Sequence, residues 1–154
     1  MAVEIERKFL IKNDSWRHLA TGKTYRQGYL CVDKDRTVRV RTAGDTAYLT
    51  VKGISVGATR LEYEYEIPVN DADMMLNQLC VRPFIEKKRY EILSDGLVWE
   101  VDEFEGANKG LIIAEVELEA EDQNFCKPDW IGEQVTGDPR YYNVNLIANP
   151  FTTW

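Results

Sequence analysis

The feature of this sequence that most constrains its fold is an alternation with a period of two, which recurs in eight segments. In seven of them, one set of alternate positions carries charged side chains and the other set carries mostly apolar side chains. Successive side chains of a β-strand point to opposite faces, so each segment is expected to be a strand with one ionic and one apolar face. The clearest example is RLEYEYEI at 60–67, which alternates charged residues with Leu, Tyr and Ile.

The expected strands follow one another with mostly short connections. They are predicted at 4–11, 24–32, 37–42, 47–52, 60–67, 84–93, 97–104 and 111–119. Short connections favour antiparallel neighbours, and eight strands are enough to close a sheet into a barrel. We therefore expect a mostly β chain of the α+β class, folded as a closed eight-stranded antiparallel β-barrel with a few flanking helices. The 154 residues are most simply one domain, 1–154.

Helices are expected at only a few places. A short helix is predicted at 14–20, where Asn13 and Asp14 are good N-caps. A second is predicted at 70–80 from its apolar rhythm, and a third at 141–148, where Pro150 stops it. The segment 130–136 is expected to be a helix or a turn. We expect the tail, 141–154, to plug one end of the barrel.

The composition excludes several classes of function. The formal net charge of -7 argues against nucleic-acid binding but allows an anionic ligand at a local basic cluster. The single histidine, His18, provides no histidine zinc site and no convincing catalytic triad. Cys31, Cys80 and Cys126 are widely spaced, which fits reduced thiols of a cytoplasmic protein. No apolar run is long enough to span a membrane, and no signal peptide is expected before Glu4.

Many charged residues come in pairs two positions apart, which puts both members on the same face of a strand. The pairs are Arg39/Arg41, Lys87/Arg89, Glu4/Glu6, Glu62/Glu64 and Glu115/Glu117. Such side chains are about 7 Å apart at their bases, so one pair can grip a metal ion or adjacent phosphates. In a closed sheet these faces point either outward, around an apolar lumen, or inward, into a charged lumen. The composition is compatible with both arrangements.

The opening Glu4-x-Glu6-x-Lys8 resembles the signature of the triphosphate tunnel metalloenzymes, also called the CYTH superfamily. The resemblance continues through QGYL, TVRVR, LTVK, RLEYEYEIP, IEKKRY, WEVDEF, AEVELE and VTGDPRYYN. It implies a barrel whose charged faces point inward and form a tunnel. Members of this superfamily bind a linear triphosphate and use a divalent metal. Some hydrolyse inorganic tripolyphosphate, nucleoside triphosphates or thiamine triphosphate, and the class IV adenylate cyclases make cyclic AMP.

The resemblance also implies roles for particular residues. The triphosphate would be bound by Lys8, Arg39, Arg41, Lys52, Arg60, Lys87, Arg89 and Tyr29. Mg²⁺ or Mn²⁺, which prefer oxygen ligands, would be held by carboxylates from the set Glu4, Glu6, Glu62, Glu64, Asp102, Glu115 and Glu117. The residues expected to take part in catalysis are Glu4, Glu6, Lys8, Lys52, Glu115 and Glu117.

The function expected from this resemblance is metal-dependent hydrolysis of a small triphosphate, most simply tripolyphosphate to pyrophosphate and phosphate. Water would attack a terminal phosphorus, and a carboxylate of the acidic cluster would take its proton. Three alternatives stay open: a class IV adenylate cyclase, a non-catalytic polyphosphate- or nucleotide-binding module, and a carrier barrel with an apolar lumen. No nucleic-acid or membrane partner is expected, and the resemblance allows a homodimer.

Overall fold

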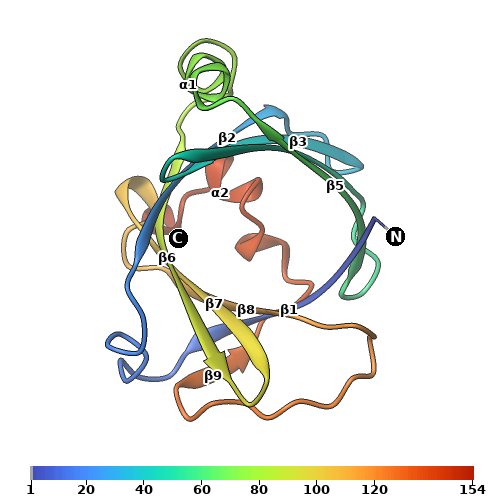
Figure 1. Cartoon of the computed structure of the whole chain (residues 1–154), viewed down its shortest axis with the longest axis vertical. Helices are drawn as coiled ribbons and strands as arrows, with labels where there is room; N and C mark the ends of the chain where they lie inside the picture. The colour runs from blue at the N-terminus through green and yellow to red at the C-terminus, as the bar shows by residue number, and fades with distance from the viewer. Residues whose placement is uncertain (1) are drawn as a thin grey trace.

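The computed structural model describes residues 2–154, and its strands form a ring around a central space (Figure 1). The strands are β1 Val3–Ile11, β2 Lys23–Cys31, β3 Arg36–Ala43, β4 Thr46–Gly53, β5 Thr59–Ile67, β6 Ile85–Ser94, β7 Leu97–Phe104, β8 Ile112–Glu117 and β9 Ile131–Gln134. The α-helices are α1 Val69–Gln78 and α2 Asn145–Ala148. The short 3-10 helices are η1 Gly106–Asn108, η2 Pro139–Tyr141 and η3 Phe151–Thr153.

Eight of the strands close into an antiparallel barrel. Neighbours follow the order β5-β4-β3-β2-β6-β7-β8-β1, and β1 pairs with β5 to complete the ring. The closing contact joins residues 3–5 of β1 to residues 59–61 of β5. The predicted eight-stranded barrel is therefore confirmed, and each strand lies within two residues of its expected bounds.

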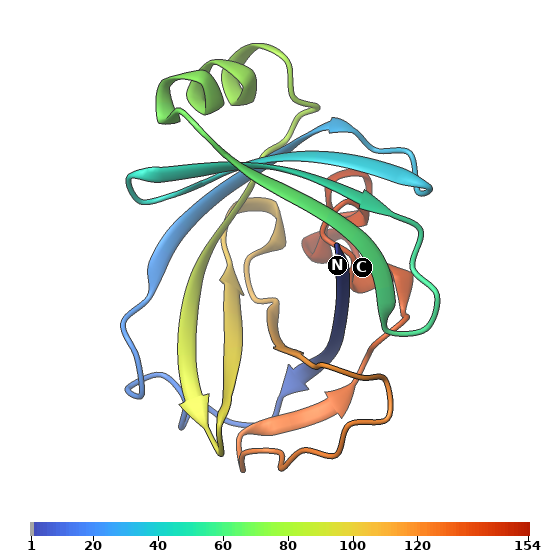
Figure 2. The same cartoon turned by 45° about the vertical axis from the view of Figure 1, so that its right-hand side comes forward.

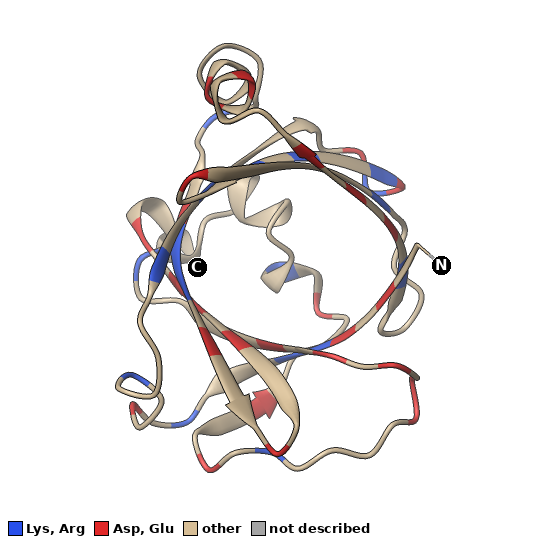
Figure 3. Ribbon diagram, in the orientation of Figure 1, with Lys and Arg blue, Asp and Glu red and all other residues tan. Residues whose placement is uncertain are grey.

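The charged faces of the strands point into the barrel, and the apolar faces point outward. Figure 3 shows that acidic and basic residues occur along the strands around the ring. On β7, Trp99 and Val101 are fully buried in an outer hydrophobic core, whereas Glu100 between them lines the inner cavity. The ring centroids of Trp99 and Phe9 are 5.6 Å apart, and those of Trp99 and Trp130 are 6.0 Å apart. An outward-facing apolar wall is stable because other parts of the chain cover it and remove it from water.

Helix α1 covers a second part of the outer wall, over β2, β3 and β4 (Figure 2). Its buried residues Ala72 and Leu76 pack against Val40 of β3. Gly28 allows this approach, because a Cβ atom there would lie only 2.9 Å from the Cβ atom of Cys80. Among residues 2–154, no helix combines the length and the apolar character needed to cross a membrane.

The C-terminal segment lies inside one end of the barrel (Figure 1). Leu146 and Ile147 of α2 are buried in a cluster with Tyr29, Ile85 and Ile113. Ile85 shares its strand face with Lys87, and Ile113 shares its strand face with Glu115, so the inner wall changes from ionic to apolar at this end. The tail therefore packs into one end of the barrel, as expected.

The segment 14–20 forms consecutive turns and not the predicted helix. Asn13 does act as a local cap, because its Oδ1 atom accepts hydrogen bonds from Ser15 N at 3.0 Å and Ser15 Oγ at 2.6 Å. So short a segment cannot sustain a helix through its own hydrogen bonds. Its path is fixed by Trp16, which is fully buried with its ring centroid 5.0 Å from that of Tyr90.

Two predictions near the C-terminus were also wrong. A helix or turn was expected at 130–136, but β9 pairs there with the last part of β1, beyond the point where β5 pairs with it. The free edge of β1 needs hydrogen-bond partners, and β9 supplies them. The segment of β9 is too short to show a period of two, so its pairing could not be predicted from the sequence. The single helix expected at 141–148 is divided into η2 and α2.

Candidate active site

The barrel encloses a cavity of about 180 Å³, to which all eight of its strands contribute side chains. The seven basic residues in its wall are Lys8, Arg39, Arg41, Lys52, Arg60, Lys87 and Arg89. The seven acidic residues are Glu4, Glu6, Glu62, Glu64, Glu100, Glu115 and Glu117. The tail adds Tyr142, Asn143 and Val144. A cavity with this many charges of both signs suits a polyanion together with a cation.

The structure brings all the predicted site residues except Asp102 to the wall of this cavity. Tyr29 and Arg60, which lie far apart in the sequence, are both part of the wall. Asp102 is fully buried behind it, with both carboxylate oxygens engaged by Lys87 and Arg89. Asp102 is therefore not arranged to reach a metal ion in the cavity, contrary to its expected role as a ligand.

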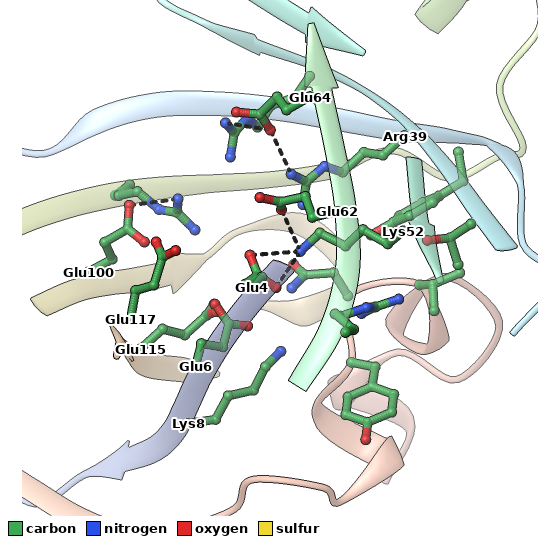
Figure 4. Close-up of a pocket in the computed structure, with 18 of the residues that line it drawn as sticks. Glu4, Glu6, Lys8, Arg39, Lys52, Glu62, Glu64, Glu100, Glu115 and Glu117 are labelled. Atoms are coloured by element: carbon green, nitrogen blue, oxygen red, sulfur yellow. Dashed lines mark hydrogen bonds and ion pairs between the residues drawn. The ribbon is translucent and has the colours of Figure 1, made fainter. Parts of the chain in front are cut away.

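Three carboxylates of β1 and β8 lie side by side without a cationic partner (Figure 4). Glu6, Glu115 and Glu117 form no ion pair with any residue of the described part of the chain. Burial and the neighbouring carboxylates Glu115 and Glu4 raise the pKa of Glu6 well above its usual range. Burial also raises the pKa of Glu117. Burial alone would raise the pKa of Glu115 too, but the more distant charges of Lys8, Arg89 and Lys87, together with a hydrogen bond from Glu6, lower it. Crowded anions of this kind would be stabilised by an additional positive charge.

The donors of this acidic cluster fit a hard divalent cation. Within residues 2–154, no three acidic, histidine or cysteine side chains are arranged to hold a metal ion by themselves. Mg²⁺ commonly keeps several waters and binds through one or two carboxylates together with phosphate oxygens of its substrate, so a complete cage is not required. Glu6, Glu115 and Glu117 supply only oxygen donors, which Mg²⁺ and Mn²⁺ prefer.

Lys52 links two further carboxylates that face the cavity. Its Nζ atom lies 3.1 Å from Glu4 Oε1 and 3.2 Å from Glu62 Oε2. Burial alone would raise the pKa of Glu4, but the charge of Lys52, together with hydrogen bonds from Glu62 and Lys52, outweighs it and the pKa is lowered. For Glu62, burial outweighs Lys52 and, with the nearby Glu4, raises the pKa to about 6. Lys52 therefore holds this pair of predicted metal ligands close to the acidic cluster.

Arg39 and Arg41 supply hydrogen-bond donors that lack acceptors. Their Nη2 atoms lie 3.7 and 3.6 Å from Glu64 Oε2, which also accepts a hydrogen bond from Thr50 Oγ1 at 2.7 Å. The Nε atoms of both arginines are buried and have no hydrogen-bond partner in the described structure. Buried donors normally have a hydrogen-bond acceptor. The N–H groups along the edge of a guanidinium can donate to two oxygens of one phosphate. These unpaired donors indicate an anion site.

Asp102 instead fixes two basic side chains of β6. Arg89 Nε donates to Asp102 Oδ1 at 2.7 Å, and Arg89 Nη2 donates to Asp102 Oδ2 at 2.8 Å. Lys87 Nζ lies 2.8 Å from Asp102 Oδ2. Burial alone would raise the pKa of Asp102, but Arg89 and Lys87 lower it. Both basic residues also line the cavity, so Asp102 sets the positions of two cations in the wall.

Four polar residues of the cavity wall were not predicted as site residues from the sequence: Thr37, Glu100, Tyr142 and Asn143. Asn143 Oδ1 accepts hydrogen bonds from Gln27 Nε2 at 3.1 Å and from Lys87 Nζ at 3.4 Å. Gln27 is fully buried and shares the period-two face of Tyr29 on β2, so the alternation could have identified it. Asn143 lies in the tail, where no periodic pattern marks a residue that faces the tunnel.

The chain matches the CYTH domain family over residues 2–147, a range that includes every residue of the cavity wall. An inorganic triphosphatase of Acetivibrio thermocellus is 58% identical over 151 residues, which is 98% of this chain and 97% of that protein. An inorganic triphosphatase of Nitrosomonas europaea is 40% identical over 152 residues, which is 95% of this chain and 97% of that protein.

The likeness extends to a solved structure of an inorganic triphosphatase. It is 36% identical and has a TM-score of 0.64, with 93% of this chain and 96% of that chain covered. Sequence and fold therefore agree on the same group of relatives across nearly the whole chain.

Proposed function

Because this chain belongs to the CYTH domain family, we propose that it is a divalent-metal-dependent triphosphatase that hydrolyses inorganic tripolyphosphate to pyrophosphate and phosphate. The observation that carries this proposal is the enclosed cavity, where buried arginine donors without acceptors face carboxylates without cations. A phosphate chain supplies the acceptors, and a divalent cation supplies the positive charge. The inorganic triphosphatases that resemble the chain over nearly its whole length support the same activity.

The basic residues of the cavity would bind the phosphate chain. Arginine can bind two phosphate oxygens in its plane, whereas lysine acts as a compact point charge. Removing a polyanion from water costs free energy unless its charges are met, and seven basic side chains surround the cavity. We assign this role to Lys8, Arg39, Arg41, Lys52, Arg60, Lys87 and Arg89, with Tyr29 beside them.

The carboxylates of the acidic cluster would hold Mg²⁺ or Mn²⁺, with Glu6, Glu115 and Glu117 as the main ligands. Glu4, Glu62 and Glu64 would complete the site or orient water. When bound, a divalent cation polarises phosphoryl oxygens and lowers the pKa of a coordinated water.

In the hydrolysis, the oxygen of a water attacks a terminal phosphorus and the bond from that phosphorus to the bridging oxygen breaks. A carboxylate of the acidic cluster takes a proton from the water, and pyrophosphate leaves with the electrons of the broken bond. Arg39, Arg41 and Arg89 stabilise the charge that develops on the leaving group. No covalent intermediate on the protein is needed.

The pH dependence should report on Lys87. Burial lowers its pKa to about 8, although Asp102 opposes this effect. As the pH rises through 8, the free enzyme loses this positive charge, so we expect kcat/KM for tripolyphosphate to fall. Lys87→Met should have a low kcat/KM at pH 7 without this decline near pH 8. A decline at the same pH in the variant would contradict the assignment to Lys87.

Thermal unfolding separates this effect from loss of the fold. The pKa of Lys87 is lower in the folded protein than its ordinary value of 10.5, so the unfolded chain binds more protons between about 8 and 10.5. The Lys87 contribution therefore makes stability rise with pH in this window, while activity falls. An alkaline decline in kcat/KM that accompanies a falling melting temperature would point to unfolding instead.

A substrate panel tests the proposed activity directly. Purified protein is incubated with tripolyphosphate, ATP or thiamine triphosphate, in the presence of Mg²⁺, Mn²⁺ or EDTA, and phosphate and cyclic AMP are measured. We expect phosphate release from tripolyphosphate with either metal and none in EDTA. Cyclic AMP from ATP would instead indicate a cyclase, and tight binding without hydrolysis would indicate a binding module. A cytoplasmic location and assembly into a homodimer remain predictions.

A further inference from the structure

Two arginines and two tyrosines alternate along the inner wall of the barrel. Arg89 lies over the ring of Tyr25, with Cζ 5.0 Å from the ring centroid. Arg41 lies over the same ring at 5.1 Å and over the ring of Tyr48 at 5.5 Å. The four side chains therefore form a continuous row, Arg89–Tyr25–Arg41–Tyr48, which we call the arginine–tyrosine ladder.

The ladder follows the order of the strands in the sheet. Arg89 belongs to β6, Tyr25 to β2, Arg41 to β3 and Tyr48 to β4, and these four strands are consecutive neighbours in the barrel. Arg41 and Arg89 line the cavity, whereas Tyr25 does not and is only 7% exposed. Tyr25 is thus a buried ring between two arginines that face the phosphate site.

The row makes physical sense because a guanidinium donates hydrogen bonds only in its own plane. An aromatic ring beside it attracts the cation and restricts its rotation without taking up its N–H groups. The N–H groups of Arg89 are held by Asp102 and Glu100, whereas Arg41 keeps a buried Nε donor without an acceptor. Burial, together with the charges of Arg39 and Arg89, lowers the pKa of Arg41, which reflects the crowding of cations here. A ring between Arg41 and Arg89 keeps the two charges apart while no anion is bound.

We propose that Tyr25 is a positioning residue that orients Arg41 and Arg89 to grip the phosphate chain of the substrate. The proposal rests on the proposed triphosphatase function for its substrate, but its geometry is independent of the reaction. Tyr48 supports the outer face of Arg41 in the same way. Both arginines contact the phosphate chain before and during the reaction, so the ladder contributes mainly to substrate binding.

Steady-state hydrolysis of tripolyphosphate tests this role. Tyr25→Leu removes the ring, and we expect KM to rise about tenfold while kcat changes by less than about threefold. Tyr25→Phe keeps the ring and should restore KM to within about twofold of the wild-type value. Tyr65→Leu is the matched control, because Tyr65 lies on β5, outside the ladder, and is 60% exposed. A role confined to stability would lower the amount of active enzyme, and hence the apparent kcat, without raising KM.

A second measurement does not depend on turnover. The Nε–Hε signals of Arg41 and Arg89 in NMR spectra should carry ring-current shifts that are lost in Tyr25→Leu and retained in Tyr25→Phe. If the wild-type protein hydrolyses no triphosphate, the proposed function fails. In that case the NMR signals of Arg41 and Arg89, together with the affinity for tripolyphosphate measured by calorimetry in EDTA, still test the role of Tyr25.

Three results would overturn the proposal: unchanged KM and unchanged arginine signals in Tyr25→Leu, unchanged binding in EDTA, or equal losses in Tyr25→Leu and Tyr25→Phe. If Tyr25→Leu does not fold, Tyr48→Leu decides, because Tyr48 is only partly buried. We then expect KM to rise about threefold and the Arg41 signal to shift. A wild-type KM and Arg41 signal in that variant would also overturn the proposal.

Discussion

Glu6→Gln should lower kcat for tripolyphosphate hydrolysis on the order of a hundredfold or more, because it removes an anionic ligand from the proposed metal site. Glu6 belongs to the cluster of carboxylates that have no cationic partner, and it is directly opposite Glu117 in the sheet. The amide keeps the size of the side chain but cannot offset the charge of a divalent cation. The measurement is steady-state phosphate release at several concentrations of Mg²⁺ and Mn²⁺.

The same change should make the metal-free protein more stable. The pKa of Glu6 is raised by burial and by Glu115 and Glu4, so the folded state binds this proton more tightly than the unfolded chain. Stability therefore falls as the pH rises through the region between the two pKa values, and above them the buried charge is a cost. We expect Glu6→Gln to melt at a higher temperature than the wild type in EDTA at pH 8.

Glu66→Gln is the control for these two measurements. Glu66 lies on the ionic face of β5, but it is exposed and is not part of the cavity wall. Its kinetics and melting temperature should equal those of the wild type. Wild-type activity in Glu6→Gln, with unchanged metal dependence, would contradict the assignment of Glu6 to the metal site.

The second large effect is expected from Asp102→Ala. This change leaves Lys87 and Arg89 buried without their shared anion, and breaking a buried ion pair on one side typically costs about 3–5 kcal/mol. For a chain of this size we expect the melting temperature to fall by roughly 10 °C or more. The melting temperatures of the variant and the wild type are measured by thermal unfolding in EDTA, where the enzyme cannot hydrolyse an added substrate.

Tripolyphosphate should partly reverse this loss. In Asp102→Ala, Lys87 loses its ion-pair partner and Arg89 keeps only Glu100, so a bound polyanion should raise the melting temperature more than it does in the wild type. Asp102→Asn keeps the volume of the side chain and separates the lost charge from the cavity that Ala leaves. Asp122→Asn, at an exposed position, is the control. A melting temperature within about 2 °C of the wild type for Asp102→Ala would contradict the role of Asp102.

The strands of this barrel could be predicted because alternation is a local property. In RLEYEYEI the period alone separates Glu62 and Glu64, which line the cavity, from Tyr63 and Tyr65, which do not. The period of two separates the ionic face of each strand from its apolar face, but it does not show which face points into the barrel. That direction depends on distant segments, such as α1 and β9, that cover the apolar wall.

The errors have a common physical cause. The segment 14–20 and β9 are short, and their structures are set by contacts with Tyr90 and with β1. Asp102 was expected to bind metal because the family resemblance included it among the acidic ligands. The period of two gives the face of a side chain, but it does not show which oxygens are already taken by Lys87 and Arg89.

The tail in one end of the barrel has a consequence for turnover. Between that tail and residues 55–60 lies a second cavity of only about 30 Å³, which has room for water but little else. We expect pyrophosphate to leave through the opening that admitted the substrate, because the tail is packed into the other end of the barrel. On a long polyphosphate we expect such an enzyme to act distributively, so that it releases the polymer after each cleavage.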